Sequence, residues 1–237
     1  MRGFIVMAMF TASLAHADWV KDYEEVRDLD LSADGISQLM INAGAGSMDV
    51  TGVEGLDEII VKATIVVPNE DEDDAVRMIQ KRIRLSLEKS ADRAELEASF
   101  ESGFQIFGDG PYIALEVSVP PGMAVNIDDG SGSIDIVDVA GDISIDDGSG
   151  SIDIRNVAQV TIDDGSGSIN IINATGDVSI VDGSGSISVK HVAGSVTVDD
   201  GSGSISVSDI DNDLVIVDDG SGSLTFSDIR GKVDADT

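Results

Sequence analysis

The chain has 237 residues, no cysteine and a formal net charge of −31, because 45 Asp and Glu residues outnumber 14 Lys and Arg residues. Such an acidic chain repels nucleic acid and anionic lipid, both of which are bound through clustered Lys and Arg. The lack of cysteine excludes disulfides, thiolate metal sites and a cysteine nucleophile. Hydrophobic residues make up 42% of the sequence, which is typical of a folded chain and not of a disordered one.

Residues 1–17 are predicted to be a signal peptide. Arg2 supplies a positive charge, Gly3 to Leu14 form an apolar run of 12 residues, and Ala15-His16-Ala17 fits the small-x-small cleavage pattern. The run is shorter than the roughly 20 residues that span a bilayer, which disfavours the alternative of an uncleaved anchor helix. Cleavage after Ala17 leaves a mature chain with 45 acidic and 13 basic residues. We expect it to be soluble, in the periplasm or outside the cell, with no membrane insertion after signal cleavage.

Residues 18–122 are predicted to form a β-rich section with one short helix. The helix is expected over Glu70–Arg82, since this segment is acidic at its start and basic at its end. Its apolar face should consist of Val76, Ile79 and Ile83. Strands are expected at Glu58–Val67, Ile83–Leu87, Ala94–Phe100 and Tyr112–Val119.

Residues 123–237 contain a repeat, the hexapeptide Asp-Gly-Ser-Gly-Ser-Ile/Leu, which occurs six times at spacings of 18, 17, 18, 18 and 19 residues. Counted from the first glycine of each copy, apolar residues recur at −5, −3, +4, +6 and +9. This alternation predicts two short strands per repeat. The first glycines are Gly130, Gly148, Gly165, Gly183, Gly201 and Gly220. An outlying copy occupies residues 43–53, with Leu39 and Ile41 at −5 and −3.

Identical offsets in every copy favour stacking over an antiparallel meander of hairpins, because stacking places each residue about 4.8 Å above its own copy. Serine at +3 in all six copies excludes a left-handed hexapeptide helix, which needs an apolar residue there. The prediction is an all-β fold: a right-handed parallel β-solenoid of rungs of about 18 residues and two strands. The repeats differ in length only between +9 and the next −5, which we assign to a loose corner opposite the glycines. The last rung should therefore bury Val215 at −5 and Val217 at −3.

Two columns of aspartate flank the tight glycine corner. The −1 column is Asp129, Asp147, Asp164, Asp182, Asp200 and Asp219, and the −2 column is Asp128, Asp146, Asp163, Asp199 and Asp218, with Val181 in the remaining copy. We expect the −1 carboxylates to accept hydrogen bonds from corner amides and the −2 carboxylates to face solvent. If those hydrogen bonds dominate, they lower the pKa values of the −1 column; if repulsion dominates at −2, it raises the pKa values there. The −2 column is also a candidate weak cation ladder for Ca²⁺.

The sequence resembles the bacterial "putative adhesin" proteins of unknown function, also called toastrack domains. The resemblance rests on Gly-Ser-Met-Asp-Val at 46–50, on Leu-Glu-Val-Ser-Val-Pro-Pro-Gly at 115–122 and on the glycine-rich rungs, and it covers about residues 36–237. It implies a single-domain β-solenoid, exported or associated with the envelope, with no established enzymatic activity. It supplies no functional residues.

We therefore expect a non-catalytic adhesin-like binding or scaffold module without a cofactor, whose partner is a protein or a polysaccharide. One alternative is an acidic Ca²⁺-binding protein of the periplasm. A second is a polysaccharide-active β-helix enzyme, which is disfavoured because the repeats offer Phe226 as their only aromatic residue and few basic groups. After cleavage the only histidine is His191, near a variable corner in one rung only, where a surface position is expected.

Overall fold

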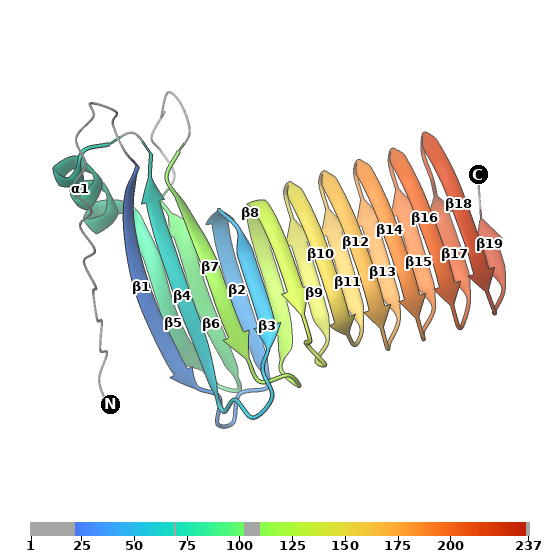
Figure 1. Cartoon of the computed structure of the whole chain (residues 1–237), viewed down its shortest axis with the longest axis horizontal. Helices are drawn as coiled ribbons and strands as arrows, with labels where there is room; N and C mark the ends of the chain where they lie inside the picture. Colours follow the sequence, from blue (N-terminus) through green and yellow to red (C-terminus); the bar gives the residue numbers. More distant parts are fainter. Residues whose placement is uncertain (1–21, 69, 102–109, 236–237) are drawn as a thin grey trace.

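The computed structural model describes residues 22–68, 70–101 and 110–235. In this part of the chain the fold is two long β-sheets packed face to face, with one helix at the N-terminal end (Figure 1). The predicted signal peptide and the cleavage site after Ala17 lie outside the described residues. No helix within the described ranges is long and apolar enough to cross a membrane.

The two sheets, here sheet A and sheet B, share one strand, β8 (Ala124–Val137). In spatial order, sheet A contains β1 (Tyr23–Ser32), β4 (Glu58–Val67), β7 (Tyr112–Val119), β3 (Met48–Gly52), β8, β10 (Gly150–Val157), β12 (Gly167–Ala174), β14 (Gly185–Val192), β16 (Gly203–Ile210) and β18 (Gly222–Ile229). Sheet B contains β5 (Ile83–Ser90), β6 (Arg93–Phe100), β2 (Gln38–Ala45), β8, β9 (Ile143–Asp147), β11 (Val160–Asp164), β13 (Val178–Asp182), β15 (Val196–Asp200), β17 (Leu214–Asp218) and β19 (Val233–Ala235).

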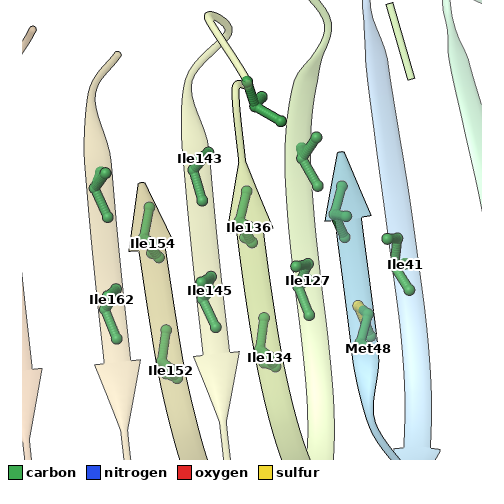
Figure 2. Close-up of a cluster of buried hydrophobic side chains, with 14 of the residues drawn as sticks. Ile41, Met48, Ile127, Ile134, Ile136, Ile143, Ile145, Ile152, Ile154 and Ile162 are labelled. Atoms are coloured by element: carbon green, nitrogen blue, oxygen red, sulfur yellow. The ribbon is translucent and has the colours of Figure 1, made fainter. Parts of the chain in front are cut away.

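The rungs stack in the predicted register. Parallel pairing places Ile152 between Ile134 and Ile169, each at the same offset in its own rung. The inward side chains form continuous columns of buried aliphatic residues between the sheets (Figure 2). Each rung shares its apolar surface with two neighbours, which offsets the entropy of ordering a segment too short to fold alone. The parallel β-solenoid is confirmed, and its right-handed winding stays a prediction.

The outlying copy of the repeat forms a rung of its own, made of β2 and β3. Leu39 pairs with Val125 and Met48 with Ile134, as the offsets predict. The chain then turns back, so that β6 and β7 pair with the other edges of β2 and β3. The first rung in the sequence therefore lies inside the stack, between β6–β7 on one side and β8 on the other.

The helix α1 (Glu72–Arg82) begins two residues later than predicted, because the side chain of Asp71 caps it by accepting a hydrogen bond from the amide of Asp74 at 3.0 Å. Its buried residues are Ala75 and Ile79, one turn apart, whereas Val76 lies at the margin of that face. The four predicted strands are present. Strand β1, which pairs antiparallel with β4, was not expected.

The last rung corrects one assignment. Leu214 and Ile216 pair with Val196 and Val198 and are buried, whereas Val217 is 49% exposed and Val215 faces outward. The extra residue forms an irregularity just before Asp218, beside the tight corner and not in the loose corner. This choice keeps two apolar side chains stacked in the interior. Phe226 is 44% exposed, because β18 is the outermost strand of sheet A within the described ranges.

Candidate functional site

The tight corner holds the −1 aspartates inside the molecule. Five of them are at most 5% exposed: Asp129, Asp147, Asp164, Asp182 and Asp200. In four of these, Oδ1 accepts a hydrogen bond from the serine amide two residues on, from 3.2 Å at Asp147 to 3.0 Å at Asp200. The predicted hydrogen bonding to corner amides is confirmed at these four residues. In the last rung the carboxylate that accepts a corner amide is that of Asp218 in the −2 column, from Gly220 N at 2.8 Å. We call the five buried residues the inner aspartate column.

The second oxygen of each carboxyl, Oδ2, is buried and has no hydrogen-bond partner among the described residues. Burial raises the pKa of Asp129 to about 7 and that of Asp182 to about 6, with neighbouring carboxylates adding to the rise. The pKa values of Asp147, Asp164 and Asp200 are raised as well, again mainly by burial. Lower pKa values from dominant corner hydrogen bonds are thus not found, because desolvation outweighs the amide hydrogen bonds.

The −2 aspartates lie on the outer face of sheet B in a single file. Asp128, Asp146 and Asp163 follow one another, Val181 interrupts the file, and Asp199 pairs with Asp218 beyond it. Val181 is itself exposed. Among the described residues no three or more acidic or histidine side chains converge in a way that could hold a metal ion. The weak cation ladder at −2 stays a prediction.

The outer face of sheet A carries a second polar file, here called the outer row. Pairing aligns Lys62, Glu116, Asp49, Asp135, Asp153, Asn170, Ser188, Ser206 and Thr225 across nine neighbouring strands. The row is acidic toward the N-terminal section and carries hydroxyl and amide groups toward the C-terminal end. Its extension beyond Asp49 to Glu116 and Lys62 was not visible in the sequence, since β4 and β7 lie outside the repeat.

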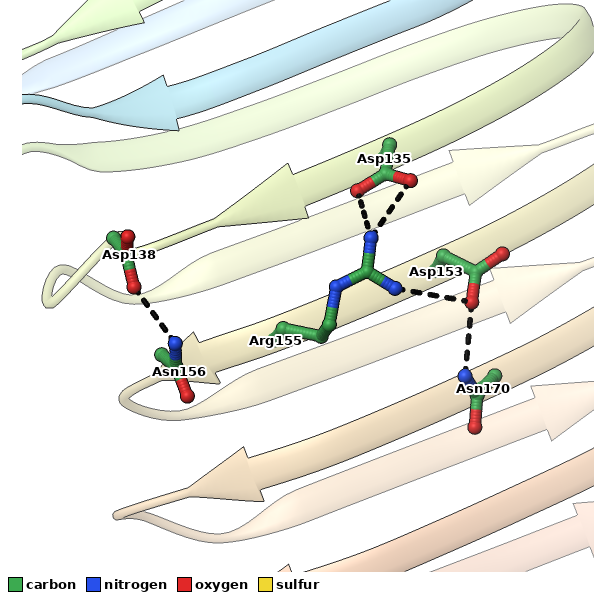
Figure 3. Close-up of polar contacts among 6 residues, drawn as sticks. All are labelled: Asp135, Asp138, Asp153, Arg155, Asn156 and Asn170. Atoms are coloured by element: carbon green, nitrogen blue, oxygen red, sulfur yellow. Dashed lines mark hydrogen bonds and ion pairs between the residues drawn. The ribbon is translucent and has the colours of Figure 1, made fainter.

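Where the outer row is most acidic within the repeats, one arginine partly neutralises it. Nη2 of Arg155 donates to Oδ1 of Asp135 at 2.8 Å, and Nη1 lies 3.7 Å from Oδ1 of Asp153 (Figure 3). The side-chain amide of Asn170 donates to the same oxygen, Oδ1 of Asp153, at 2.9 Å. These links tie three rungs together on the outside of the sheet.

A third column lies beside the loose corner and was not expected from the repeat. Every residue at +8 has a left-handed backbone with φ between 56° and 64°, and the six are Asp138, Asn156, Asn173, His191, Asp209 and Asp228. Asn, Asp and His tolerate this conformation better than other residues, which was the available signal. The side-chain amide of Asn156 donates to Asp138 at 2.8 Å (Figure 3), and that of Asn173 donates to Asn156 at 2.9 Å.

His191 belongs to this column and lies on the surface, as expected. Its Nδ1 is 3.4 Å from a carboxylate oxygen of Asp209. Both side chains line a shallow hollow of about 390 Å³, together with Asp211 and Arg230. Arg230 is already paired with Asp211. The hollow thus holds two neighbouring pairs, His191 with Asp209 and Arg230 with Asp211.

No family model matches the sequence, and no curated protein matches it. Similar solved structures include a putative cell adhesion protein from Clostridium sporogenes, at 12% identity over 91% of this chain and 99% of that chain, with a TM-score of 0.32. A putative adhesin from Bacteroides fragilis is 12% identical over 89% of this chain and 97% of the other, with a TM-score of 0.40.

Proposed function

We propose that the protein is an exported, non-catalytic β-solenoid that acts in the cell envelope or outside the cell as an adhesin-like binding or scaffold module. The supporting observation is the outer row, in which pairing sets like side chains side by side on successive strands. Neighbouring strands lie about 4.8 Å apart, so the row offers regularly spaced polar groups on a broad β-surface. A surface of this kind suits a long, repetitive partner better than a small substrate.

The chemistry of the row favours a polysaccharide as that partner. Its C-terminal half consists of Asn170, Ser188, Ser206 and Thr225, which offer donors and acceptors without charge. Hydroxyl-rich polymers are bound through such groups, whereas the acidic half of the row fits a basic protein. The polar side chains of the hollow at His191 are largely paired with one another, which gives the enzyme alternative little support.

The test is binding of the mature protein to a glycan array and to immobilised envelope polysaccharides, with basic proteins as a second panel. Ser206→Arg adds a long charged side chain to the outer row of sheet A. Ser179→Arg, on the outer face of sheet B, is the matched control, since both serines are exposed and lie on strands of the same solenoid.

We expect saccharide binding that Ser206→Arg abolishes and Ser179→Arg preserves. Equal loss in both variants, or no binding to any saccharide, would contradict the assignment of the row. Capture of basic proteins alone would point to a protein partner, and release of saccharide fragments would point to the enzyme. Saturable Ca²⁺ binding that Asp146→Asn removes would favour the periplasmic Ca²⁺-binding alternative.

Export has its own measurement. Mass spectrometry of the protein from its native host should find Asp18 as the first residue. A chain that keeps Met1 and sediments with membranes would contradict cleavage and the soluble location.

A further inference from the structure

The inner aspartate column runs through five consecutive rungs. Register pairs each member with the next, from Asp129 through Asp147, Asp164 and Asp182 to Asp200. The strands that carry them lie about 4.8 Å apart. Five carboxyl groups are therefore stacked inside the molecule at the spacing of the backbone itself.

Each carboxyl is only half satisfied. In four of them Oδ1 accepts a hydrogen bond from a serine amide, and Asp129 accepts one from the amide of Gly130. In all five Oδ2 is buried and has no hydrogen-bond partner among the described residues. A buried charge with an unpaired oxygen is costly, and like charges at this spacing repel one another. If all five carboxyl groups were ionised, the column would therefore destabilise the folded state in every rung.

The surrounding charges do not relieve this repulsion. Asp129 is influenced by Asp128 and Asp147, and Asp147 by Asp146 and Asp164. The charged groups that act on the remaining members are also acids. They are Asp163 on Asp164; Asp164 and Asp200 on Asp182; and Asp199, Asp218 and Asp219 on Asp200. Among the described residues, the charged side chains that shift the pKa values of the column are all acidic.

We propose that the inner aspartate column is a file of proton-binding sites, in which a protonated Oδ2 donates a hydrogen bond to the carboxyl group of the neighbouring rung. A neutral carboxyl has one donor, and its neighbour has the acceptor that this donor needs. If the two oxygens of each carboxyl lie along the column, the distance between them takes up part of the rung spacing of about 4.8 Å. The remainder is the gap between an oxygen of one carboxyl and the nearest oxygen of the next. That brings the gap within reach of an O–H···O⁻ hydrogen bond of about 2.5–2.7 Å.

A proton fits these sites better than a metal ion. Ca²⁺ takes about six to eight oxygen ligands, whereas each interval of the column brings together only two carboxyl groups. The described residues also include no cluster of three or more acidic side chains arranged to hold a metal. The proton needs one donor and one acceptor, and the column supplies both.

The raised pKa values agree with this arrangement and set its pH range. Asp129 titrates near 7 and Asp182 near 6 in the folded protein, against 3.8 for an ordinary aspartate. A raised folded pKa gives stability that is complete below the unfolded pKa and is lost as pH rises through the folded pKa. The solenoid should thus be most stable in mildly acidic solution and weaken between about pH 4 and pH 7.

The test combines two measurements on the mature protein. Urea unfolding is followed between pH 4 and pH 8, and infrared spectroscopy at pH 6 detects the C=O stretch of protonated carboxyl groups. Asp164→Asn places a neutral side chain of the same shape in the column. Asp163→Asn, its exposed neighbour in the −2 file, is the matched control.

We expect the unfolding equilibrium constant to rise with pH through this range, by up to about tenfold per pH unit for each proton retained by the fold. Asp164→Asn should flatten this slope, weaken the protonated-carboxyl band and stabilise the protein at pH 7. Asp163→Asn should change the slope and the band much less, because it removes one charge beside Asp164 and no carboxyl of the column.

Three results would overturn the proposal. One is stability that is constant or rises with pH between 4 and 7, and another is the absence of the protonated-carboxyl band at pH 6. The third is stabilisation by Ca²⁺ at pH 7 that Asp164→Asn removes and Asp163→Asn retains, which would assign the column to a metal. If Asp164→Asn does not fold, the measurements on the unmodified protein still decide.

Discussion

Replacement of Gly167 by alanine is a direct test of how closely the tight corners stack. A Cβ atom on Gly167 would lie 1.5 Å from the carbonyl oxygen of Gly150 in the preceding rung, and the glycine has φ of +153°. The two corners would have to separate, which would break the hydrogen bonds from Gly150 N to Ser166 O (3.0 Å) and from Gly165 N to Asp147 O (2.9 Å). Two such bonds at about 1 kcal/mol each, with backbone strain of about 1–3 kcal/mol, give a destabilisation of roughly 3–5 kcal/mol.

Urea unfolding followed by circular dichroism measures this loss. Gly122→Ala is the matched control, because a Cβ atom on Gly122 would have nothing within 4 Å and its backbone is not in the left-handed region. We expect the control to unfold at nearly the urea concentration of the unmodified protein and Gly167→Ala to unfold well below it. Equal midpoints for the two variants would refute the close backbone stacking of the corners.

Three other changes probe the rest of the rung. Deletion of Gly148–Asp164 should leave a solenoid one rung shorter, with a β-type spectrum and cooperative melting, whereas an unfolded product would show that rungs are not interchangeable. Ile152→Asp, at a position with 0% exposure, should cost roughly 3–5 kcal/mol by burying an unpaired charge; a melting temperature close to that of the unmodified protein would mean that this side chain does not face the interior. Asn173→Val, at φ of 64°, should cost about 1–2 kcal/mol in urea unfolding. Ser188→Val, on an extended part of the next rung, should be nearly neutral, and equal effects of the two valines would argue against the left-handed corner.

The stacking could be predicted from the sequence because the repeat leaves little choice. Offsets shared by Ile134, Ile152 and Ile169 place these residues in one column, and the structure agrees. The last rung was misassigned because Leu214-Val215-Ile216-Val217 contains two apolar alternations, one residue apart. Only packing decides between them, since one set matches the columns already formed by β15.

Other features depend on information that the repeat does not carry. Strand β1 has Glu25 and Arg27 at half-buried positions, so its alternation is hidden. The hydrogen bonds of the −1 aspartates follow from the Asp-Gly corner, but the unpaired second oxygen does not. Its burial depends on the depth of the corner inside the stack, which is a property of neighbouring rungs and not of the local sequence.

The position of β2 and β3 has a consequence for how the chain folds. Because the later rungs are nearly identical, a rung that docked one repeat out of step would still match its neighbours residue for residue, and a misaligned stack would gain most of the energy of the native one. The β2–β3 rung has no such ambiguity, since β6 and β7 occupy one side of it and β8 the other. The non-repetitive section thus acts as a template, and β8 docks on the edge that β2 and β3 offer. Assembly is then directional, and fidelity depends on each rung docking on the one that precedes it in the chain.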